Sequence, residues 1–177
     1  MKEVKVCNKP VHVWDDLFTY QQRISFFQFM QKSFYKVDGG DYSVFDNQIY
    51  SQYTNLDLMK LGFMETDGFS QLNKFYNLEK REYSQIRINF SSFSEKNRVH
   101  HDGVKLTLLY YANLEWDIEW GGHTFFLNEQ LTDIEYTCVY NPGRVVVFDG
   151  SLPHMIMSPN VMSQKPRFSL VIQYHGE

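Results

Sequence analysis

The sequence predicts a mainly β fold, a sandwich or jelly roll with helices packed on one face. Aromatic residues make up 17% of the 177 positions, and aromatic side chains favour strands. Ala112 is the only alanine, which argues against a helical bundle because alanine is the strongest helix former. A helical first part of the chain gives way after about residue 81 to short alternating segments. Helices followed by a series of short strands are typical of this class of fold.

Helical signals are confined to the first part of the chain. The predicted helices cover residues 14–35, 55–61 and 67–78. In the first of them, apolar residues recur at three- and four-residue steps from Leu17 to Met30, and Asp15 or Asp16 is the expected N-cap. The second is expected to end at Gly62.

Strand signals dominate from about residue 81 onward. The clearest strands are predicted at residues 84–90, 105–112, 144–148 and 168–174. Turn signals separate them, including Gly121-Gly122 and Asn141-Pro142-Gly143. We therefore expect one domain over residues 1–177, with a helical support region at 1–80 and the jelly-roll core at 81–177.

Charge and cysteine content narrow the classes of partner and compartment. The net charge of −4 argues against a general phosphate-binding surface, so no nucleic-acid partner is expected. No apolar run reaches the ~18 residues needed to cross a bilayer, and the charged start lacks a signal peptide. The two cysteines, Cys7 and Cys138, are far apart and form neither a disulfide framework nor a zinc ribbon. These features indicate a cytoplasmic protein without a membrane partner.

The sharpest chemical signal is His100-His101-Asp102. Side chains two apart on a strand share a face, so His100 and Asp102 are expected to point together and His101 away. A histidine and a carboxylate need a third ligand, and two histidines with one carboxylate form the iron(II) site of many oxygenases. His-Asp also occurs in helical metal phosphohydrolases, but the flanking residues here are rich in β-formers.

His154 is the expected second histidine, because it follows the predicted strand at 144–148 and so lies at the rim of the sheet. His123, after Gly121-Gly122, is the serious competitor. His12 lies in the leading segment and His175 near the end of the chain, which makes both weaker candidates.

An anion-binding group is predicted on the last strand. Arg167 and Ser169 share a face there, and an arginine grips a carboxylate through two hydrogen bonds while a serine adds a hydroxyl. Tyr110 is expected to offer its hydroxyl to the same anion. The alternative for Arg167 is a surface ion pair at the end of a strand.

The ordered set of these motifs resembles the 2-oxoglutarate- and iron(II)-dependent dioxygenases, and most closely their prolyl 4-hydroxylase-like branch. The resemblance covers roughly Tyr83 to Tyr174. It is carried by His100-x-Asp102, Leu109-Tyr110-Tyr111-Ala112-Asn113, Trp120-Gly121-Gly122, Pro142-Gly143-Arg144, Val147-Phe148, His154 and Arg167-x-Ser169.

The resemblance implies a double-stranded β-helix core and an enzyme that hydroxylates an unactivated C–H bond, with a prolyl residue of a protein or peptide as the first substrate to consider. It implies Fe(II) on His100, Asp102 and His154, and 2-oxoglutarate held by Arg167 with Tyr110. Molecular oxygen is the further cosubstrate, and ascorbate is an optional addition.

Alternatives remain at this point. The substrate could be a free amino acid or another small molecule, or the chain could be a cupin-like metal-binding module or a structural protein without oxygenase activity. Two departures from the family pattern bear on the substrate. Phe90 stands where several relatives carry a tyrosine, and Gln173 replaces an aromatic residue.

Overall fold

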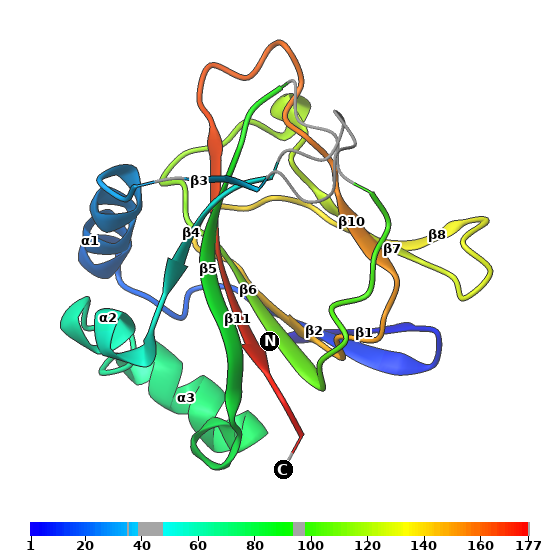
Figure 1. Cartoon of the computed structure of the whole chain (residues 1–177). Helices are drawn as coiled ribbons and strands as arrows, with labels where there is room; N and C mark the ends of the chain where they lie inside the picture. Colours follow the sequence, from blue (N-terminus) through cyan, green and yellow to red (C-terminus); the bar gives the residue numbers. More distant parts are fainter. Residues whose placement is uncertain (35, 39–47, 94–97, 177) are drawn as a thin grey trace.

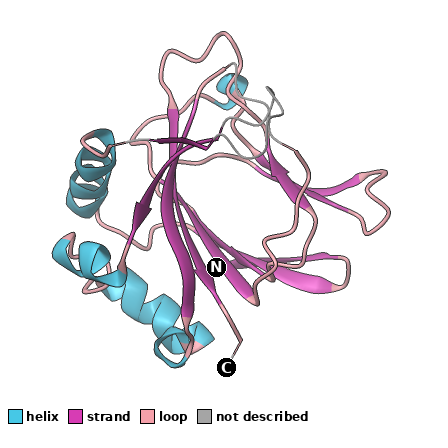
Figure 2. Ribbon diagram, in the orientation of Figure 1, coloured by secondary structure: helices cyan, strands magenta, loops and turns pink. Residues whose placement is uncertain are grey.

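The structure is a computed structural model that describes residues 1–34, 36–38, 48–93 and 98–176. Two antiparallel sheets face each other, and three helices lie against the outer side of the larger sheet (Figures 1 and 2). The larger sheet has the order β1-β2-β9-β6-β11-β5-β4-β3, and the smaller has the order β10-β7-β8. The predicted mainly β fold with N-terminal helices is confirmed.

The elements have the following bounds. The strands are β1 (Lys2–Val6), β2 (Lys9–Trp14), β3 (Lys36–Asp38), β4 (Gln48–Tyr53), β5 (Tyr83–Ser91), β6 (Leu106–Tyr111), β7 (Thr124–Leu127), β8 (Ile134–Cys138), β9 (Val145–Phe148), β10 (His154–Ile156) and β11 (Arg167–Tyr174). The helices are α1 (Tyr20–Gln31), α2 (Asn55–Lys60) and α3 (Asp67–Tyr76), with the short 3-10 helices η2 (Leu78–Lys80) and η3 (Ile118–Trp120).

The start of the chain differs from the sequence-based prediction. Residues before Trp14 form a hairpin, and β2 continues the large sheet by pairing with β9, where Val11 lies opposite Phe148. The first helix begins later than predicted, and its N-cap is Thr19 rather than Asp15 or Asp16. Thr19 accepts a hydrogen bond from the Gln22 amide while the Gln22 side chain accepts one from the Thr19 amide, which forms a capping box.

Alternation along the strands builds two apolar clusters, one on each side of the large sheet. On β11, Phe168, Leu170 and Ile172 pack in the cluster beneath the helices. Val171 points the other way, into the cluster between the two sheets. The predicted division of this strand into two faces is therefore confirmed, and the face carrying Arg167 and Ser169 is the inner face, between the sheets.

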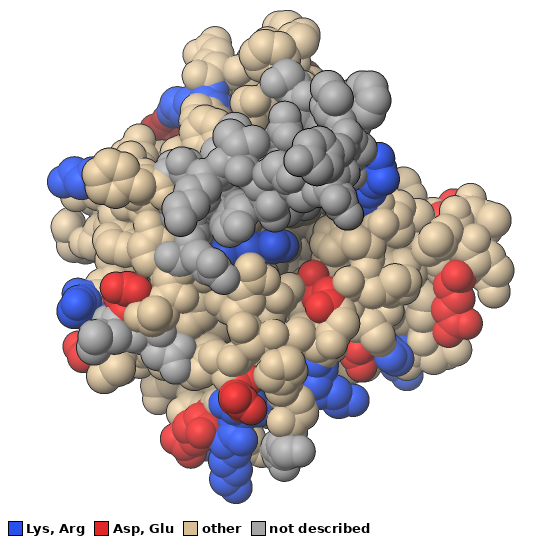
Figure 3. All heavy atoms as spheres, viewed as in Figure 1, with Lys and Arg blue, Asp and Glu red and all other residues tan. Residues whose placement is uncertain are grey.

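Charges are dispersed over the described part of the face shown in Figure 3, where acidic and basic side chains are interspersed. None of the described helices has the length and apolarity that a bilayer crossing requires.

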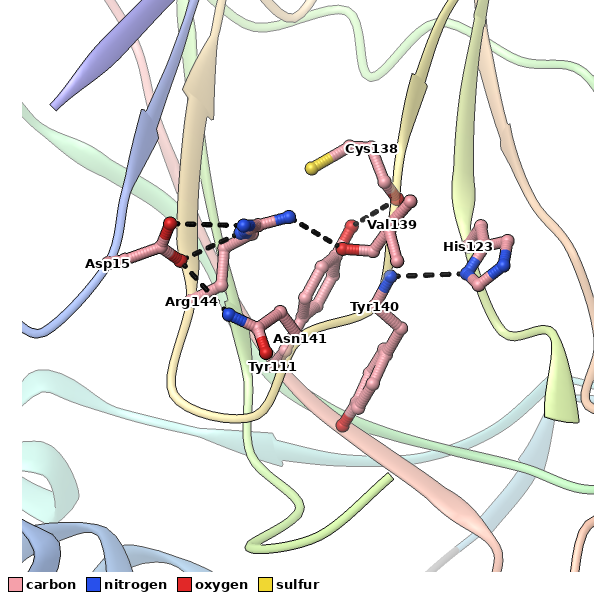
Figure 4. A network of polar contacts seen from close by, with 8 residues as sticks. All are labelled: Asp15, Tyr111, His123, Cys138, Val139, Tyr140, Asn141 and Arg144. Atoms are coloured by element: carbon pink, nitrogen blue, oxygen red, sulfur yellow. Dashed lines mark hydrogen bonds and ion pairs between the residues drawn. The ribbon is translucent and has the colours of Figure 1, made fainter. Parts of the chain in front are cut away.

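A bidentate ion pair fastens the segment between β2 and α1 to the start of β9. Arg144 donates from Nε to Asp15 Oδ1 (2.8 Å) and from Nη2 to Asp15 Oδ2 (3.0 Å), and its Nη1 donates to the Val139 carbonyl (Figure 4). These hydrogen bonds from Arg144 hold the pKa of Asp15 below its usual value of 3.8.

Replacing Asp15 by asparagine should lower the free energy of unfolding at neutral pH by about 0.5–1 kcal/mol, because the pair is partly exposed to solvent. A carboxyl whose pKa is lowered on folding adds stability above its unfolded-state pKa and loses it as the pH falls through the folded-state value. Urea unfolding should therefore show a difference at pH 7 that vanishes in acid well below 3.8. Asp16→Asn, at an exposed position, is the matched control. A difference that persists in acid would contradict the prediction.

Candidate metal centre

The metal centre is built where the chain before β6 runs beside β10. His100 and His154 exchange two backbone hydrogen bonds, from His100 N to His154 O (2.9 Å) and from His154 N to His100 O (3.0 Å). This pairing sets the two imidazole rings side by side, with centroids 4.4 Å apart. Asp102 is anchored by its own amide, which donates to the Gly150 carbonyl.

The three predicted ligands come together. His100 Nε2 lies 3.6 Å from Asp102 Oδ1, and His154 Nε2 lies 3.7 Å from Asp102 Oδ2. One ligand atom from each residue lies within 4.8 Å of the others. Within the described part of the chain, no second cluster of three histidine, cysteine or acidic residues has this spacing. His101 points away, as predicted, and its Nδ1 hydrogen-bonds to the Ser151 carbonyl.

Both imidazoles present the nitrogen that a metal needs. Nδ1 of His100 donates to the Arg98 carbonyl (3.0 Å), and Nδ1 of His154 donates to the Leu152 carbonyl (2.9 Å). Because a carbonyl only accepts hydrogen bonds, the proton of each neutral ring sits on Nδ1, and Nε2 keeps its lone pair. The two Nε2 atoms are the ones that face Asp102.

Burial keeps the His154 ring of this site neutral. His154 is 4% exposed and packs against the rings of Phe126 and Phe148, and this burial lowers the pKa of His154 to about 4, so the ring is unprotonated at neutral pH. The Asp102 carboxylate is also buried and accepts a hydrogen bond from the Thr107 hydroxyl. Two imidazole nitrogens and one carboxylate form the donor set of a non-heme iron(II) site.

Thr107→Val should lower metal affinity by about tenfold to a hundredfold, because the hydroxyl orients the Asp102 carboxylate and is lost without a change in shape. Anaerobic titration with Fe(II) would measure the change. Thr137→Val, on β8 away from the cluster, should bind as wild type does. Equal affinities in all three proteins would show that Thr107 does not position Asp102.

Arg167 lies on the inner face of the large sheet and is fully buried. Its Nε donates to the Gly122 carbonyl (2.9 Å), its Nη1 donates to Ser169 Oγ (3.0 Å), and its guanidinium lies over the rings of Tyr111 and Tyr140. Its Nη2 is buried without a hydrogen-bond partner. None of the ion pairs among the described residues includes Arg167. A buried cation without a counter-ion is costly, so this group fits an anionic ligand.

His123, the predicted competitor of His154, is not part of the metal cluster. Its Nδ1 accepts a hydrogen bond from the Tyr140 amide (3.1 Å; Figure 4). Burial and then the charge of Arg167 lower the pKa of His123, which favours a neutral ring with its proton on Nε2. His123 therefore belongs to the surroundings of Arg167.

The expectation for Tyr110 is corrected by the structure. Its ring packs against Phe18 and Phe63 in the cluster beneath the helices, on the outer side of the sheet. Tyr111 lies on the inner face instead, with its ring 5.3 Å from the Arg167 guanidinium carbon. The double tyrosine was visible in the sequence, but which of the two faces inward depends on the register, where Tyr111 lies opposite Ser169.

Comparisons with known proteins place the fold. No family model matches the sequence, and no curated protein matches it. Among solved structures, a prolyl-4-hydroxylase of Pseudomonas putida has a TM-score of 0.70 and 13% identity over 94% of this chain and 92% of that chain. A prolyl hydroxylase of Trichoplax adhaerens, solved with a peptide fragment of the hypoxia inducible factor oxygen degradation domain, has a TM-score of 0.69 and 13% identity over 93% of this chain and 83% of its own.

A third similar structure is the epimerase SnoN, solved with Fe3+, alpha ketoglutarate (2-oxoglutarate) and nogalamycin RO. Its TM-score is 0.68, with 12% identity over 93% of this chain and 78% of that chain. The predicted likeness to these enzymes is thus confirmed at the level of the fold, and the fold together with the His-Asp-His cluster indicates an enzyme. The chain has the double-stranded β-helix fold of the prolyl 4-hydroxylases and other iron- and 2-oxoglutarate-dependent enzymes.

Proposed function

We propose that the protein is a 2-oxoglutarate- and Fe(II)-dependent dioxygenase that hydroxylates an unactivated C–H bond. The observation that carries the proposal is the coexistence, between the two sheets, of a metal cluster whose Nε2 atoms keep their lone pairs and a buried guanidinium without a counter-ion. His100, Asp102 and His154 would hold the iron. Arg167 would hold the far carboxylate of 2-oxoglutarate through its unpartnered Nη2, with Ser169 fixing the guanidinium by accepting from Nη1.

The bound iron and 2-oxoglutarate supply the chemistry, in which O2 oxidises a substrate C–H bond while 2-oxoglutarate is decarboxylated to succinate. The protein orients these groups. Thr107 keeps Asp102 in place, the two carbonyls at Arg98 and Leu152 keep both imidazoles in the ligating tautomer, and the rings of Phe126 and Phe148 exclude water from His154.

As substrate we propose a prolyl residue in a protein or peptide. Support comes from the motif resemblance to the prolyl 4-hydroxylase branch and from the likeness in fold to two prolyl hydroxylases, one of them solved with a peptide. The same fold also occurs in an epimerase, so the fold alone does not choose the substrate. The unpaired thiols of Cys7 and Cys138 fit the cytoplasmic location that we propose.

The test starts without oxygen. Addition of Fe(II) and then 2-oxoglutarate should produce a weak visible charge-transfer band, and admission of oxygen should produce succinate. Turnover of a peptide library, read by mass spectrometry, should then show the gain of one oxygen atom on a proline-containing peptide. Ascorbate is added in parallel to learn whether it sustains turnover.

Each alternative gives a different result. Metal binding without any response to 2-oxoglutarate would contradict the proposal and indicate a cupin-like metal-binding module. Binding of neither would indicate a structural protein. Succinate formation with oxygen transfer only to a free amino acid or another small molecule would keep the dioxygenase and overturn the prolyl substrate.

A further inference from the structure

The inner face of the large sheet is divided into a polar half and an apolar half. On β5 and β11 the residues that face the helices are apolar, as Ile86, Ile88 and Leu170 show. The alternate residues face the space between the sheets, and most of them are polar. We call this set the polar wall; it consists of Gln85, Asn89 and Ser91 on β5 and of Ser169 and Gln173 on β11.

The polar wall begins beside the metal centre. Gln173 lies directly opposite Thr107 on β6, and Thr107 donates its hydroxyl to Asp102. On its other side Gln173 lies opposite Gln85 of β5. The Cβ atoms of directly opposed residues on neighbouring antiparallel strands are about 5 Å apart. Gln85, Gln173 and Thr107 therefore form one row across the sheet, and Thr107 is the residue that donates to Asp102.

The other half of the same row is apolar. Phe148 of β9 lies opposite Thr107 and packs against the ring of His154. Leu109 and Val146 continue this apolar half one step further along β6 and β9. A substrate that reaches the metal centre therefore meets hydrocarbon on one side and carboxamides on the other.

Two members of the polar wall are buried carboxamides. Gln173 is 4% exposed and Asn89 is 8% exposed. Asn89 Oδ1 is buried without a hydrogen-bond partner. A buried acceptor left unpaired is unfavourable, so this atom calls for an N–H or O–H donor from a ligand. Arg87, the charged residue between Gln85 and Asn89 on this face, already has a partner.

The free groups of the polar wall are neutral. A carboxamide offers both donors and an acceptor, and its natural complement is another amide. A carboxylate has no hydrogen to donate and would leave Asn89 Oδ1 unpaired, whereas an amide N–H pairs with it.

We propose that the polar wall binds a main-chain amide of a peptide substrate, while the residue to be oxidised lies against Phe148 and the apolar half. The proposal rests on the dioxygenase function proposed above and names the chemical class that this site selects. Gln173 and Asn89 are the specificity-determining residues.

The test uses pairs of small probes that differ in a single group. Each pair is an N-acetyl amino acid as its N-methylamide and as its methyl ester, with proline first and then other aliphatic side chains. Binding to the enzyme loaded with Fe(II) and 2-oxoglutarate is measured by calorimetry without oxygen, and succinate formation is measured after oxygen is admitted. In wild type, the amide of at least one pair should bind about tenfold or more tightly than its ester, because the ester lacks the N–H donor.

The variants locate the effect. Amide and ester differ in a single N–H, and Asn89 lies four residues along β5 from Gln85, which is opposite Gln173, so only one of the two carboxamides pairs with that N–H. The preference for the amide should therefore fall to about twofold or less in one of the variants Gln173→Leu and Asn89→Ser, and it should persist in the other. Because amide and ester are compared within one protein, a general loss of activity does not affect the result. Gln71→Leu, on the exposed side of α3, should keep the full preference.

The outcomes separate this proposal from the function on which it rests. If no charge-transfer band forms in wild type, the dioxygenase proposal fails and this one with it. If the band forms but no pair binds with a preference for the amide, or if the preference survives in both variants, only the amide-binding proposal is overturned.

Discussion

His154→Ala should bind Fe(II) at least about a hundredfold more weakly than wild type and should give no charge-transfer band with 2-oxoglutarate. Loss of a residue that only hydrogen-bonds to a metal ligand lowers metal affinity by about tenfold to a hundredfold, and loss of the ligand itself should lower it further. His154 is the buried one of the two histidine ligands, so solvent replaces it less readily than the partly exposed His100. Anaerobic iron titration and the visible spectrum measure both effects.

His123→Ala is the matched control for this variant, since His123 is also partly buried but lies outside the cluster. It should bind iron as wild type does. Because removal of a buried ring leaves a cavity, the melting temperature of both variants should be measured as well. Wild-type iron affinity in a folded His154→Ala protein would contradict the assignment of the metal centre.

Arg167→Met should raise the KM for 2-oxoglutarate by about a hundredfold or more, since two hydrogen bonds to a charged group contribute about 1.5–3 kcal/mol each. The variant should also lose the preference for 2-oxoglutarate over 2-oxovalerate, which has the same chain length but lacks the far carboxylate. Without ligand its melting temperature should change little, because removal of an uncompensated buried charge offsets the lost hydrogen bond to the Gly122 carbonyl.

Ligand-induced stabilisation gives a second measurement of the same prediction. At a hundred times its Kd, 2-oxoglutarate should stabilise wild type by about 2.7 kcal/mol, and at the same concentration it should stabilise Arg167→Met by only about 0.4 kcal/mol or less. Arg144→Met is the control, because it breaks the ion pair with Asp15 and should lower stability without changing the KM. An unchanged KM in Arg167→Met would remove the anion-binding role from this residue.

Local patterns in the sequence were sufficient for much of the architecture. Period-two alternation in residues 168–174 predicts which residues of β11 share a face, and the structure confirms this division because a strand with one apolar face has a strongly specified register. The second and third helices were also predicted within two residues of their observed ends, because apolar spacing and a following glycine or turn are local signals.

The N-terminal hairpin was missed for the opposite reason. The stretch from Lys9 to Trp14 is too short to stand out, and what makes it a strand is its pairing with β9, more than a hundred residues away. The residues Asp38-Gly39-Gly40-Asp41 and the polar stretch from Ser91 to Arg98 are also loop signals in the sequence, and both lie partly outside the described residues.

The sequence by itself determined which residue types are available for chemistry: a histidine and a carboxylate two apart, a second histidine after a strand, and an arginine with a serine on the last strand. Only the tertiary structure decided how they meet. The bridge between His100 and His154 fixes the imidazole geometry, and the register of β6 against β11 chooses Tyr111 over Tyr110. The tertiary structure also turns the polar side of β5 inward, because the helices cover the apolar side of this strand. No local sequence pattern records which side of a sheet the helices will cover.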